Sequence, residues 1–342
     1  MADETHEISR VAVIGAGSWG TALANLLAEK GLDIDLWVRE EEVRRQISGE
    51  RVNGLFLPGV ALSERLNPVG TFEEALSGKE LALLVVPSHV FRDVLTRMKP
   101  CLAPGMELIA ATKGIENETL MVMSQVAESV LPERFCRRFS CLAGPSFAVE
   151  VAKRYPTAVT IGCPDRDHAE RLQRLFSQEN FRVYVSHDLM GVQLGGALKN
   201  VIAIAAGAAD GLGFGHNARA ALITRGLAEI TRLGVALGAT PLTFAGLAGM
   251  GDLVLTCTGD LSRNRTVGLQ IGEGKSLDDI TAGMSMVAEG VKTSRSAYAL
   301  SRKVGVDMPI IQQVYEILWE KKDPRAAVKE LMTRELKVEL EH

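Results

Sequence analysis

Short runs of apolar residues alternate with amphipathic segments over the first half of the chain. Each run spans four to six residues, and the first is followed by a helical pattern at residues 18–30. Such lengths are typical of strands buried on both faces. We expect strands at residues 11–14, 34–38, 81–86, 107–112, 140–143 and 157–161. Apolar strands separated by helices predict a doubly wound parallel sheet covered on both faces.

The pattern changes near residue 188. Beyond it the chain is rich in Ala, Gly and Leu and has few β-branched runs, which favours closely packed helices. We expect helices at residues 188–209, 218–237, 264–272, 291–304 and 309–319. The fold class is therefore α/β followed by all-α, with one domain at residues 1–189 and a second at residues 190–342.

Composition narrows the class of protein. The 342 residues exceed one ordinary core. A net charge of −4 without any basic run argues against a nucleic-acid partner. The most apolar stretch, residues 201–209, is far shorter than the roughly 18 residues of a spanning helix, and residues 1–7 lack the basic start of a secretory signal. We expect a cytoplasmic protein without a membrane span.

Cysteine and histidine indicate neither disulfides nor a metal site. The five cysteines are an odd number without CxxC spacing, which is typical of reduced, mostly buried thiols. The histidines have no ligand-like spacing to one another or to cysteine. The last residues, Leu340, Glu341 and His342, resemble the remnant of a cloning tag.

Residues 15–20 join the first strand to the first helix and match G-x-G-x-x-G. This position supplies the context that the dinucleotide-binding motif needs. Gly15 permits the tight turn, Gly17 lets a pyrophosphate approach the backbone, and Gly20 lets the helix pack on the strand. Free N–H groups at the helix start favour phosphates. The first domain is therefore predicted to be a Rossmann dinucleotide-binding domain; the alternative is a glycine turn without a ligand.

Arg39 follows the second strand, where NAD-binding domains usually place an Asp or Glu for the ribose 2′-hydroxyl. A guanidinium suits a 2′-phosphate because it can donate two hydrogen bonds to it. We therefore favour NADP and keep NAD open. The alternative is a solvated surface arginine.

Three polar turns follow predicted strands, at residues 87–88, 112–114 and 144–146. Because ligands of open α/β sheets bind at the carboxyl ends of the strands, we expect a ligand edge here. A single lysine such as Lys113 after a strand is otherwise usually solvated.

Lys199 and Asn200 interrupt an apolar helical stretch. A buried lysine is costly unless it is paired or used, and burial moves its pKa toward the range of a proton donor or acceptor. The alternative is a lysine whose ammonium reaches the surface. We favour an acid/base role for Lys199.

Two polar segments follow at residues 249–252 and 259–265. Asp252 is expected to pair with Lys199 or bind a substrate hydroxyl, unless it only caps a helix. Ser262, Arg263 and Asn264 open a helix and would make a phosphate cradle, unless Ser262 is a simple cap beside exposed arginines.

Taken in order and spacing, these motifs resemble the bacterial NAD(P)-dependent glycerol-3-phosphate dehydrogenases, from about residue 11 to residue 320. The segments that carry the resemblance are GAGSWGTALA (15–24), ATKGIE (111–116), LAGPSFAVEV (142–151), GALKNVIAIAAGAADGLGFGHNARAALITRGLAEITRLG (196–234), GLAGMGDLVLTCTG (246–259), SRNR (262–265) and VAEGVKT (287–293). The resemblance implies reversible conversion of dihydroxyacetone phosphate to sn-glycerol 3-phosphate, which feeds phospholipid synthesis. It also implies a homodimer.

The resemblance also implies roles for individual residues, with Lys199 as the acid/base. It implies substrate contacts from Lys113, Gly144, Ser146, Lys199, Asn200, Asp252, Ser262, Arg263 and Asn264. It implies cofactor contacts, beside the glycines of residues 15–20, from Ser18, Trp19, Arg39, Lys113, Ala148, Arg263, Val287 and Glu289.

Two other functions compete with this one. A related dehydrogenase of the β-hydroxyacid or ketopantoate type would need a carboxylate clamp, whereas residues 262–265 look more like a phosphate site. A non-catalytic NAD(P)H sensor would have no use for an inward Lys199.

Overall fold

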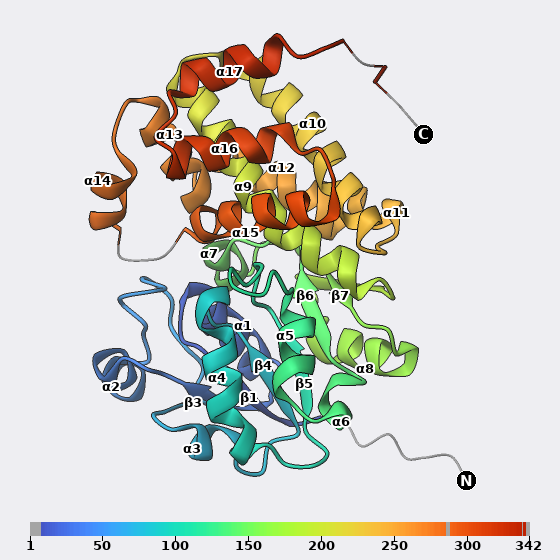
Figure 1. The fold of residues 1–342 in the computed structure, drawn as a ribbon. Coiled ribbons are helices and arrows are strands. Elements are labelled where there is room, and N and C mark those ends of the chain that lie inside the picture. The colour runs from blue at the N-terminus through green and yellow to red at the C-terminus, as the bar shows by residue number, and fades with distance from the viewer. Residues whose placement is uncertain (1–7, 285–287, 337, 340–342) are drawn as a thin grey trace.

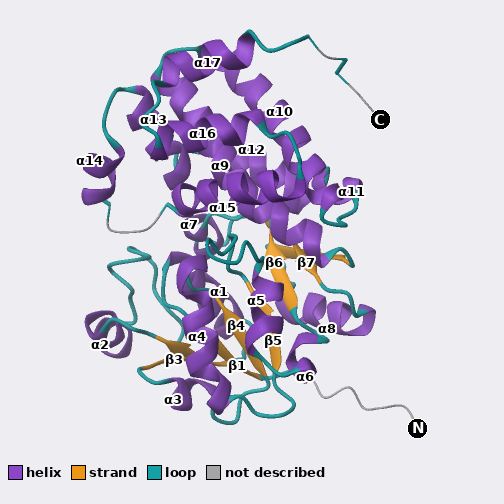
Figure 2. Cartoon of the chain, viewed as in Figure 1, coloured by secondary structure: helices purple, strands orange, loops and turns teal. Residues whose placement is uncertain are grey.

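The chain folds into a sheet domain and a helical domain that are stacked on each other (Figure 1). The structure is a computed structural model that describes residues 8–284, 288–336 and 338–339. Strands occur in the lower domain of the view and the upper domain is built of helices (Figure 2). The predicted α/β fold followed by an all-α part is confirmed. The predicted boundary between residues 189 and 190 lies at the start of a helix and stays a prediction.

One eight-stranded sheet has the order β3-β2-β1-β4-β5-β6-β7-β8. The strands are β1 (Arg10–Ile14), β2 (Asp33–Trp37), β3 (Leu66–Val69), β4 (Leu81–Leu84), β5 (Glu107–Ala110), β6 (Ser140–Ala143), β7 (Thr157–Gly162) and β8 (Phe181–Ser186). Val11 of β1 lies opposite Ile34 on one side and Leu81 on the other. The strand order reverses next to β1, so β1 is central to any ligand site at the carboxyl edge.

Helices cover both faces of the sheet because successive strand side chains point to opposite sides. Val11 and Val13 belong to one apolar core, and Ala12 and Ile14 belong to another. The first core includes α1 (Ser18–Glu29), α2 (Glu41–Glu50), α7 (Ala148–Ala152) and α8 (Arg166–Phe176). The second includes α3 (Phe72–Leu76), α4 (Phe91–Met98), α5 (Met123–Val130) and α6 (Glu133–Cys136). Two short 3₁₀ turns span Ser88–Val90 and Lys99–Cys101.

The expectation of a wholly parallel sheet is wrong at residues 157–161. Strand β7 runs antiparallel to β6, with Ala143 opposite Thr160. The connection contains only the five-residue helix α7, which is too short to carry the chain back across the sheet. The chain therefore turns back at the carboxyl edge, and the turn at residues 144–146 remains there.

Two edge strands escape prediction from the apolar runs. Strand β3 contains Pro68, which lacks an N–H group and is tolerated at a sheet edge. Strand β8 alternates buried Phe181 and Val183 with exposed Arg182 and Tyr184. That alternation is typical of a strand covered on one face, and a search for continuous apolar runs does not detect it.

Helix α9 (Leu189–Gly211) forms the centre of the helical domain. The others are α10 (Gly215–Ala236), α11 (Pro241–Phe244), a π-helical turn (Leu247–Gly251), α12 (Asp252–Thr258), α13 (Arg263–Gly272), α14 (Leu277–Ala282), α15 (Glu289–Val304), α16 (Pro309–Trp319) and α17 (Pro324–Met332). A Cβ atom added at Gly207 or Gly268 would overlap the backbone of the facing helix. Small residues thus let α9 and α13 approach closely.

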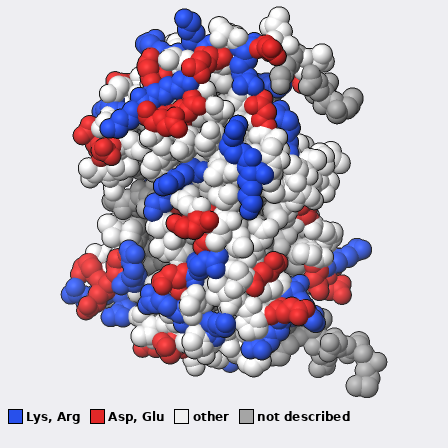
Figure 3. Space-filling view, viewed as in Figure 1, with Lys and Arg blue, Asp and Glu red and all other residues white. Residues whose placement is uncertain are grey.

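Two segments are long and apolar enough to cross a membrane, Leu189–Gly211 and Pro241–Thr258. The most apolar window of the first is 83% buried, and that of the second is 39% buried. Neither is a clear membrane span, because α9 is the core helix and the second segment comprises α11, the π-helical turn and α12, which pack on α9. On the face shown in Figure 3, acidic and basic side chains of the described residues are intermixed over both domains.

Candidate active site

Most of the predicted site residues gather where the carboxyl edge of the sheet meets the helical domain. Lys113 follows β5 and is bonded to Asp252 at the start of α12. Ser88 follows β4 and is bonded to Glu289 at the start of α15. Residues far apart in the sequence therefore meet at one interface between the two domains (Figure 1).

A buried carboxylate joins two lysines at the centre of this interface. The Lys199 ammonium donates to Asp252 Oδ1, and the Lys113 ammonium donates to Asp252 Oδ2 at 2.8 Å. Lys199 Nζ also donates to Thr256 Oγ1 at 2.8 Å, while that hydroxyl donates to the Asp252 carbonyl at 2.6 Å. The Asp252 side chain is 1% exposed and that of Lys199 is 8% exposed. The inward position predicted for Lys199 on α9 is thus observed, and two side chains of α12 hold its ammonium.

Burial lowers the pKa of Lys199 from 10.5 to about 7. The carboxylate of Asp252 opposes this shift, and the neighbouring ammonium of Lys113 adds to it. Two ammonium groups compete for one carboxylate, so the proton on Lys199 is held less firmly than in an isolated ion pair. A lysine with a pKa near neutrality can both give and take a proton under ordinary conditions.

The alternative of simple helix capping is resolved differently for the two residues concerned. Asp252 is the first residue of α12, but its carboxylate binds the lysines and does not cap the helix. Ser262 does cap α13, since its Oγ accepts the backbone N–H of Arg265 at 3.2 Å. The substrate contact predicted for Ser262 remains a prediction.

Hydrogen bonds between amide groups connect the start of α13 to α9, the helix that carries Lys199. Asn264 Nδ2 donates to Asn200 Oδ1 at 2.9 Å, and the backbone N–H of Gly290 donates to Asn264 Oδ1 at 2.9 Å. Asn200 is the neighbour of Lys199 on α9, so the network ties the starts of α13 and α15 to α9. Arg263, one residue earlier, reaches solvent and interacts electrostatically with Glu289.

Gly144 and Ser146 form a turn next to the same lysines. The Gly144 carbonyl accepts Lys113 Nζ at 3.5 Å and Ser146 Oγ at 3.0 Å. Gly144 has a φ of 145°, and an added Cβ would lie 2.9 Å from Val159 Cα. Only glycine fits this turn, which brings the residue 144–146 backbone under the helical domain.

The glycine turn at residues 15–20 has the shape that a dinucleotide phosphate needs. Gly15 has a φ of 116°, and a Cβ there would lie 2.6 Å from the Val85 carbonyl oxygen. A Cβ at Gly20 would overlap the Gly15 carbonyl. Among the residues that the structure describes, a Cβ at Gly17 would in contrast meet no atom within 4 Å, and no side chain caps α1. The turn is thus tightly packed at Gly15 and Gly20 but open at Gly17, next to the start of α1. This arrangement leaves room for a pyrophosphate at the helix start.

Three other predicted cofactor residues lie on α1 and on α7, which packs against it. Ser18 Oγ donates to the Phe56 carbonyl at 2.5 Å, and Trp19 Nε1 is buried without a hydrogen-bond partner among the described residues. Ala148 begins α7, which packs on α1. Val287 lies outside the described residues.

Arg39 lies just beyond β2 with a side chain that is 76% exposed. Its Nε donates to Glu40 Oε1 at 2.9 Å, so a 2′-phosphate would have to compete with this carboxylate. Both the phosphate-binding prediction and its alternative, a solvated arginine, stay open.

Sequence reasoning missed Thr256 as a site residue. It lies one helical turn after Asp252, and residues four apart on a helix share a face. The four-residue spacing could have indicated that the Thr256 hydroxyl lies beside the Asp252 carboxylate. Among the described residues, no group of three or more His, Cys, Asp or Glu side chains could hold a metal ion.

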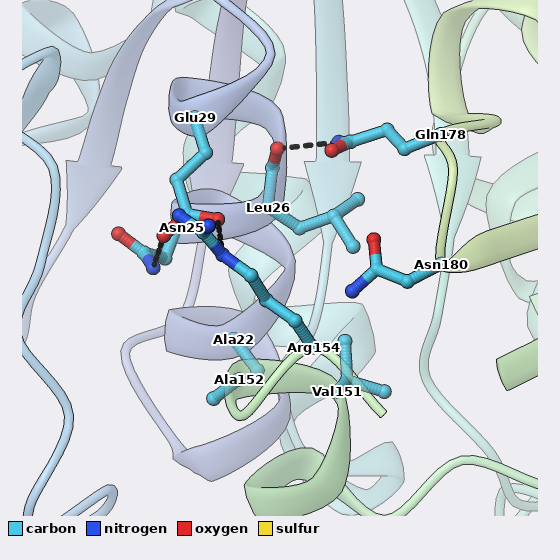
Figure 4. A pocket seen from close by; sticks show the side chains of 9 residues that line it. All are labelled: Ala22, Asn25, Leu26, Glu29, Val151, Ala152, Arg154, Gln178 and Asn180. Atoms are coloured by element: carbon cyan, nitrogen blue, oxygen red, sulfur yellow. Dashed lines mark hydrogen bonds and ion pairs between the residues drawn. The ribbon is translucent and has the colours of Figure 1, made fainter. Parts of the chain in front are cut away.

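A small pocket also lies between α1 and α7 (Figure 4). The ion pair between Glu29 Oε2 and Arg154 Nε spans it at 3.2 Å, and Gln178 Nε2 donates to the Leu26 carbonyl at 2.6 Å. None of the predicted site residues lines this pocket. We therefore place the site at the domain interface.

Comparison with known proteins agrees with the motifs. The model of the NAD-dependent glycerol-3-phosphate dehydrogenase N-terminus matches residues 10–169, and that of the C-terminus matches residues 188–329. The glycerol-3-phosphate dehydrogenase (NAD(P)+) of Geobacter sulfurreducens is 59% identical over 330 residues, which cover 96% of this chain and 98% of that protein.

Solved structures separate this family from the competing one. Glycerol-3-phosphate dehydrogenase from Coxiella burnetii has a TM-score of 0.91 at 40% identity, covering 96% of this chain and 99% of that chain. A ketopantoate reductase from Ralstonia eutropha has a TM-score of 0.58 at 16% identity, covering 94% and 99%, and shares the fold alone. The chain belongs to the NAD-dependent glycerol-3-phosphate dehydrogenase family, as the order and spacing of its motifs predict.

Proposed function

We propose that this chain interconverts dihydroxyacetone phosphate and sn-glycerol 3-phosphate with NAD(P)H and so supplies glycerol 3-phosphate for phospholipid synthesis. The observation that carries the proposal is the cluster of Lys199, Asp252 and Lys113, which joins the turn after β5 to α9 and α12. The name of the Geobacter sulfurreducens relative supports the same reaction.

The nicotinamide cofactor supplies or accepts the hydride, and the protein must position the carbonyl and move a proton. During reduction, the Lys199 ammonium donates its proton to the oxygen at C2 of the substrate as that oxygen becomes an alkoxide. Asp252 and Thr256 fix the direction of Nζ, and the charge of Lys113 stabilises the developing oxyanion. During oxidation, neutral Lys199 takes the hydroxyl proton.

The substrate phosphate is proposed to bind at the start of α13. The helix start offers backbone N–H groups and a positive dipole, and Arg263 and Asn264 add side-chain donors. Binding energy from this remote group would hold the reacting carbon in place. The proposed contacts of Gly144, Ser146, Asn200 and Ser262 complete the substrate pocket.

The experiment that tests the function follows oxidation of NADPH and NADH with dihydroxyacetone phosphate, with small keto acids and with no ketone. We expect turnover with dihydroxyacetone phosphate alone. Preference for a keto acid would favour the hydroxy-acid type of enzyme, and cofactor binding without turnover on any ketone would favour a sensor.

The titration of Lys199 predicts opposite pH profiles for the two directions. Since reduction needs the ammonium, kcat/KM for dihydroxyacetone phosphate should fall about tenfold per pH unit above the pKa of about 7. Oxidation needs neutral Lys199 and should rise up to that pH and then level off. Both profiles should be measured between pH 6.5 and 9, where the substrate phosphate stays mostly dianionic. Profiles with the same slope in both directions would contradict the role of Lys199.

Arg39→Ala is expected to weaken the binding of NADPH roughly tenfold to a hundredfold, because a charge-assisted contact to the 2′-phosphate is lost. The binding of NADH should weaken much less. Direct titration of both cofactors checks this. Arg45→Ala is the matched control, since Arg45 is an exposed arginine of α2 that pairs with Glu42. Equal weakening of the two cofactors would show that Arg39 does not bind the phosphate.

A homodimer in the cytoplasm is also proposed. The family resemblance supports both, and the exposed apolar side chains of Leu242, Met250 and Val254 on α11, the π-helical turn and α12 support a partner surface. Sedimentation of the pure protein tests the oligomeric state; a monomer at micromolar concentration would reject the dimer.

A further inference from the structure

A hydrogen bond between the two domains lies at the carboxyl edge of the sheet and has no part in the mechanism above. Ser88 is the first residue of the 3₁₀ turn Ser88–Val90 that follows β4, and Glu289 is the first residue of α15. Ser88 Oγ donates to Glu289 Oε2 at 2.7 Å. Ser88 is 4% exposed, so water competes little for this contact.

The packing of the neighbouring turn restricts where the Ser88 hydroxyl can point. Gly114 has a φ of 151°, and an added Cβ would overlap Ser88 Oγ and lie 3.5 Å from Glu289 Oε2. Gly114 is the residue after Lys113. The turn after β5 thus leaves just enough room for the serine side chain between itself and Glu289.

The carboxyl group of Glu289, which accepts the Ser88 hydroxyl, has a shifted pKa. Burial raises the pKa of Glu289, and the hydrogen bond from Ser88, together with the charges of Lys292 and Arg263, opposes that rise. The adenosine half of a dinucleotide lies over β2 when the pyrophosphate is at the α1 start, which leaves the carboxyl ends of β4 and β5 for the nicotinamide half. Ser88 and Gly114 follow these two strands, so Glu289 lies at that end of the cofactor site.

We propose that Ser88 is a positioning residue that orients the carboxylate of Glu289 toward the nicotinamide half of the cofactor and thereby couples domain contact to cofactor binding. The chemistry recognised by Glu289 is a hydrogen-bond donor, either a ribose hydroxyl or a carboxamide N–H. The inference rests on the proposed NAD(P)H-dependent reaction and on the cofactor contact that the family resemblance implies for Glu289. Loss of the serine hydroxyl leaves the carboxylate in place but free to turn away.

The test compares Ser88→Ala, Glu289→Ala and the double variant by direct titration with NADPH, without substrate. Ser88→Ala is expected to weaken the binding of NADPH about tenfold, which is the effect of losing a hydrogen bond to a charged group. The double variant should bind no more weakly than Glu289→Ala alone, because the serine acts through the carboxylate. In steady-state assays, Ser88→Ala should raise KM for NADPH more than it lowers kcat at saturating cofactor.

Ser296→Ala is the matched control. Ser296 lies on the same helix α15, is 1% exposed and donates to the Ile115 carbonyl across the same interface at 3.1 Å. Thermal unfolding should report similar losses of stability for the two serine variants. Only Ser88→Ala should weaken the binding of NADPH.

Unchanged NADPH affinity in Ser88→Ala, or equal weakening in Ser296→Ala, would overturn the inference. Additive effects of Ser88→Ala and Glu289→Ala would also overturn it. Unchanged affinity in Glu289→Ala would remove the cofactor role on which it rests. Turnover of dihydroxyacetone phosphate by the unsubstituted protein is measured separately, so each of these results leaves the proposed reaction standing.

Discussion

Lys199→Met is expected to lower kcat for dihydroxyacetone phosphate by about 100-fold or more while NADPH affinity stays nearly unchanged, as for loss of a positioned acid/base. The methionine fills a similar volume but cannot donate a proton to the forming alkoxide. Asp252 keeps its bond to Lys113, so the carboxylate is not left without a partner. Stopped-flow measurement of a single turnover separates this loss in chemistry from product release.

Lys79→Met supplies a matched control for burying a methionine in place of a paired lysine. The Lys79 side chain is 9% exposed and its Nζ lies 2.7 Å from Asp35 Oδ2. Lys79 precedes β4, at the sheet edge opposite the site. It should lose stability without losing turnover. Near-normal turnover in a folded Lys199→Met protein would reject the acid/base role.

The parts of the fold set by local chemistry were predictable from the sequence. The turn at residues 15–20 needs a positive φ at Gly15 and no side chain at Gly20, and both demands can be recognised in the motif. The apolar strands of the sheet centre, such as β1 and β4, are buried on both faces and appear as continuous runs. The central helix α9 was likewise visible from its length and small residues.

Features that depend on tertiary contacts were not predictable. The reversal of β7 depends on how far α7 can carry the chain, which no periodicity encodes. Thr256 becomes significant only once α9 and α12 pack with Lys199 between them. The Ser88 contact with Glu289 joins positions that are 201 residues apart, and each residue alone is an ordinary polar side chain near a turn or helix start.

Two helix starts were each compatible with more than one role for their first polar side chain, and tertiary contacts decide between the roles. Ser262 and Asp252 both open helices and both suit an N-cap. Ser262 caps its helix, whereas two lysines draw the Asp252 carboxylate away from the helix end. Ion pairing in a buried site outweighs the modest stabilisation of about 1 kcal/mol from a cap.

Arg263→Ala should sharply lower kcat/KM for dihydroxyacetone phosphate and barely change the weak reaction with unphosphorylated dihydroxyacetone. A guanidinium beside the α13 start adds a bidentate partner for a phosphate dianion, and such a contact is worth roughly tenfold to a hundredfold in binding. In the proposed site the phosphate anchors the substrate, so loss of the Arg263 contact should also misplace the carbonyl and lower kcat along with affinity. Assays at saturating NADPH remove the contribution of any contact from Arg263 to the cofactor.

Arg265→Ala distinguishes this role from general damage to α13. Arg265 lies two residues further along the same helix, but its guanidinium pairs with Asp210, with Nε 3.0 Å from Oδ2. Its loss should reduce stability and affect both substrates by the same factor, because its guanidinium is paired with Asp210 and is not among the proposed phosphate contacts. If Arg263→Ala also lowered the rates with both substrates equally, Arg263 would serve the cofactor or the fold. The phosphate would then have to bind at another group of donors on this interface.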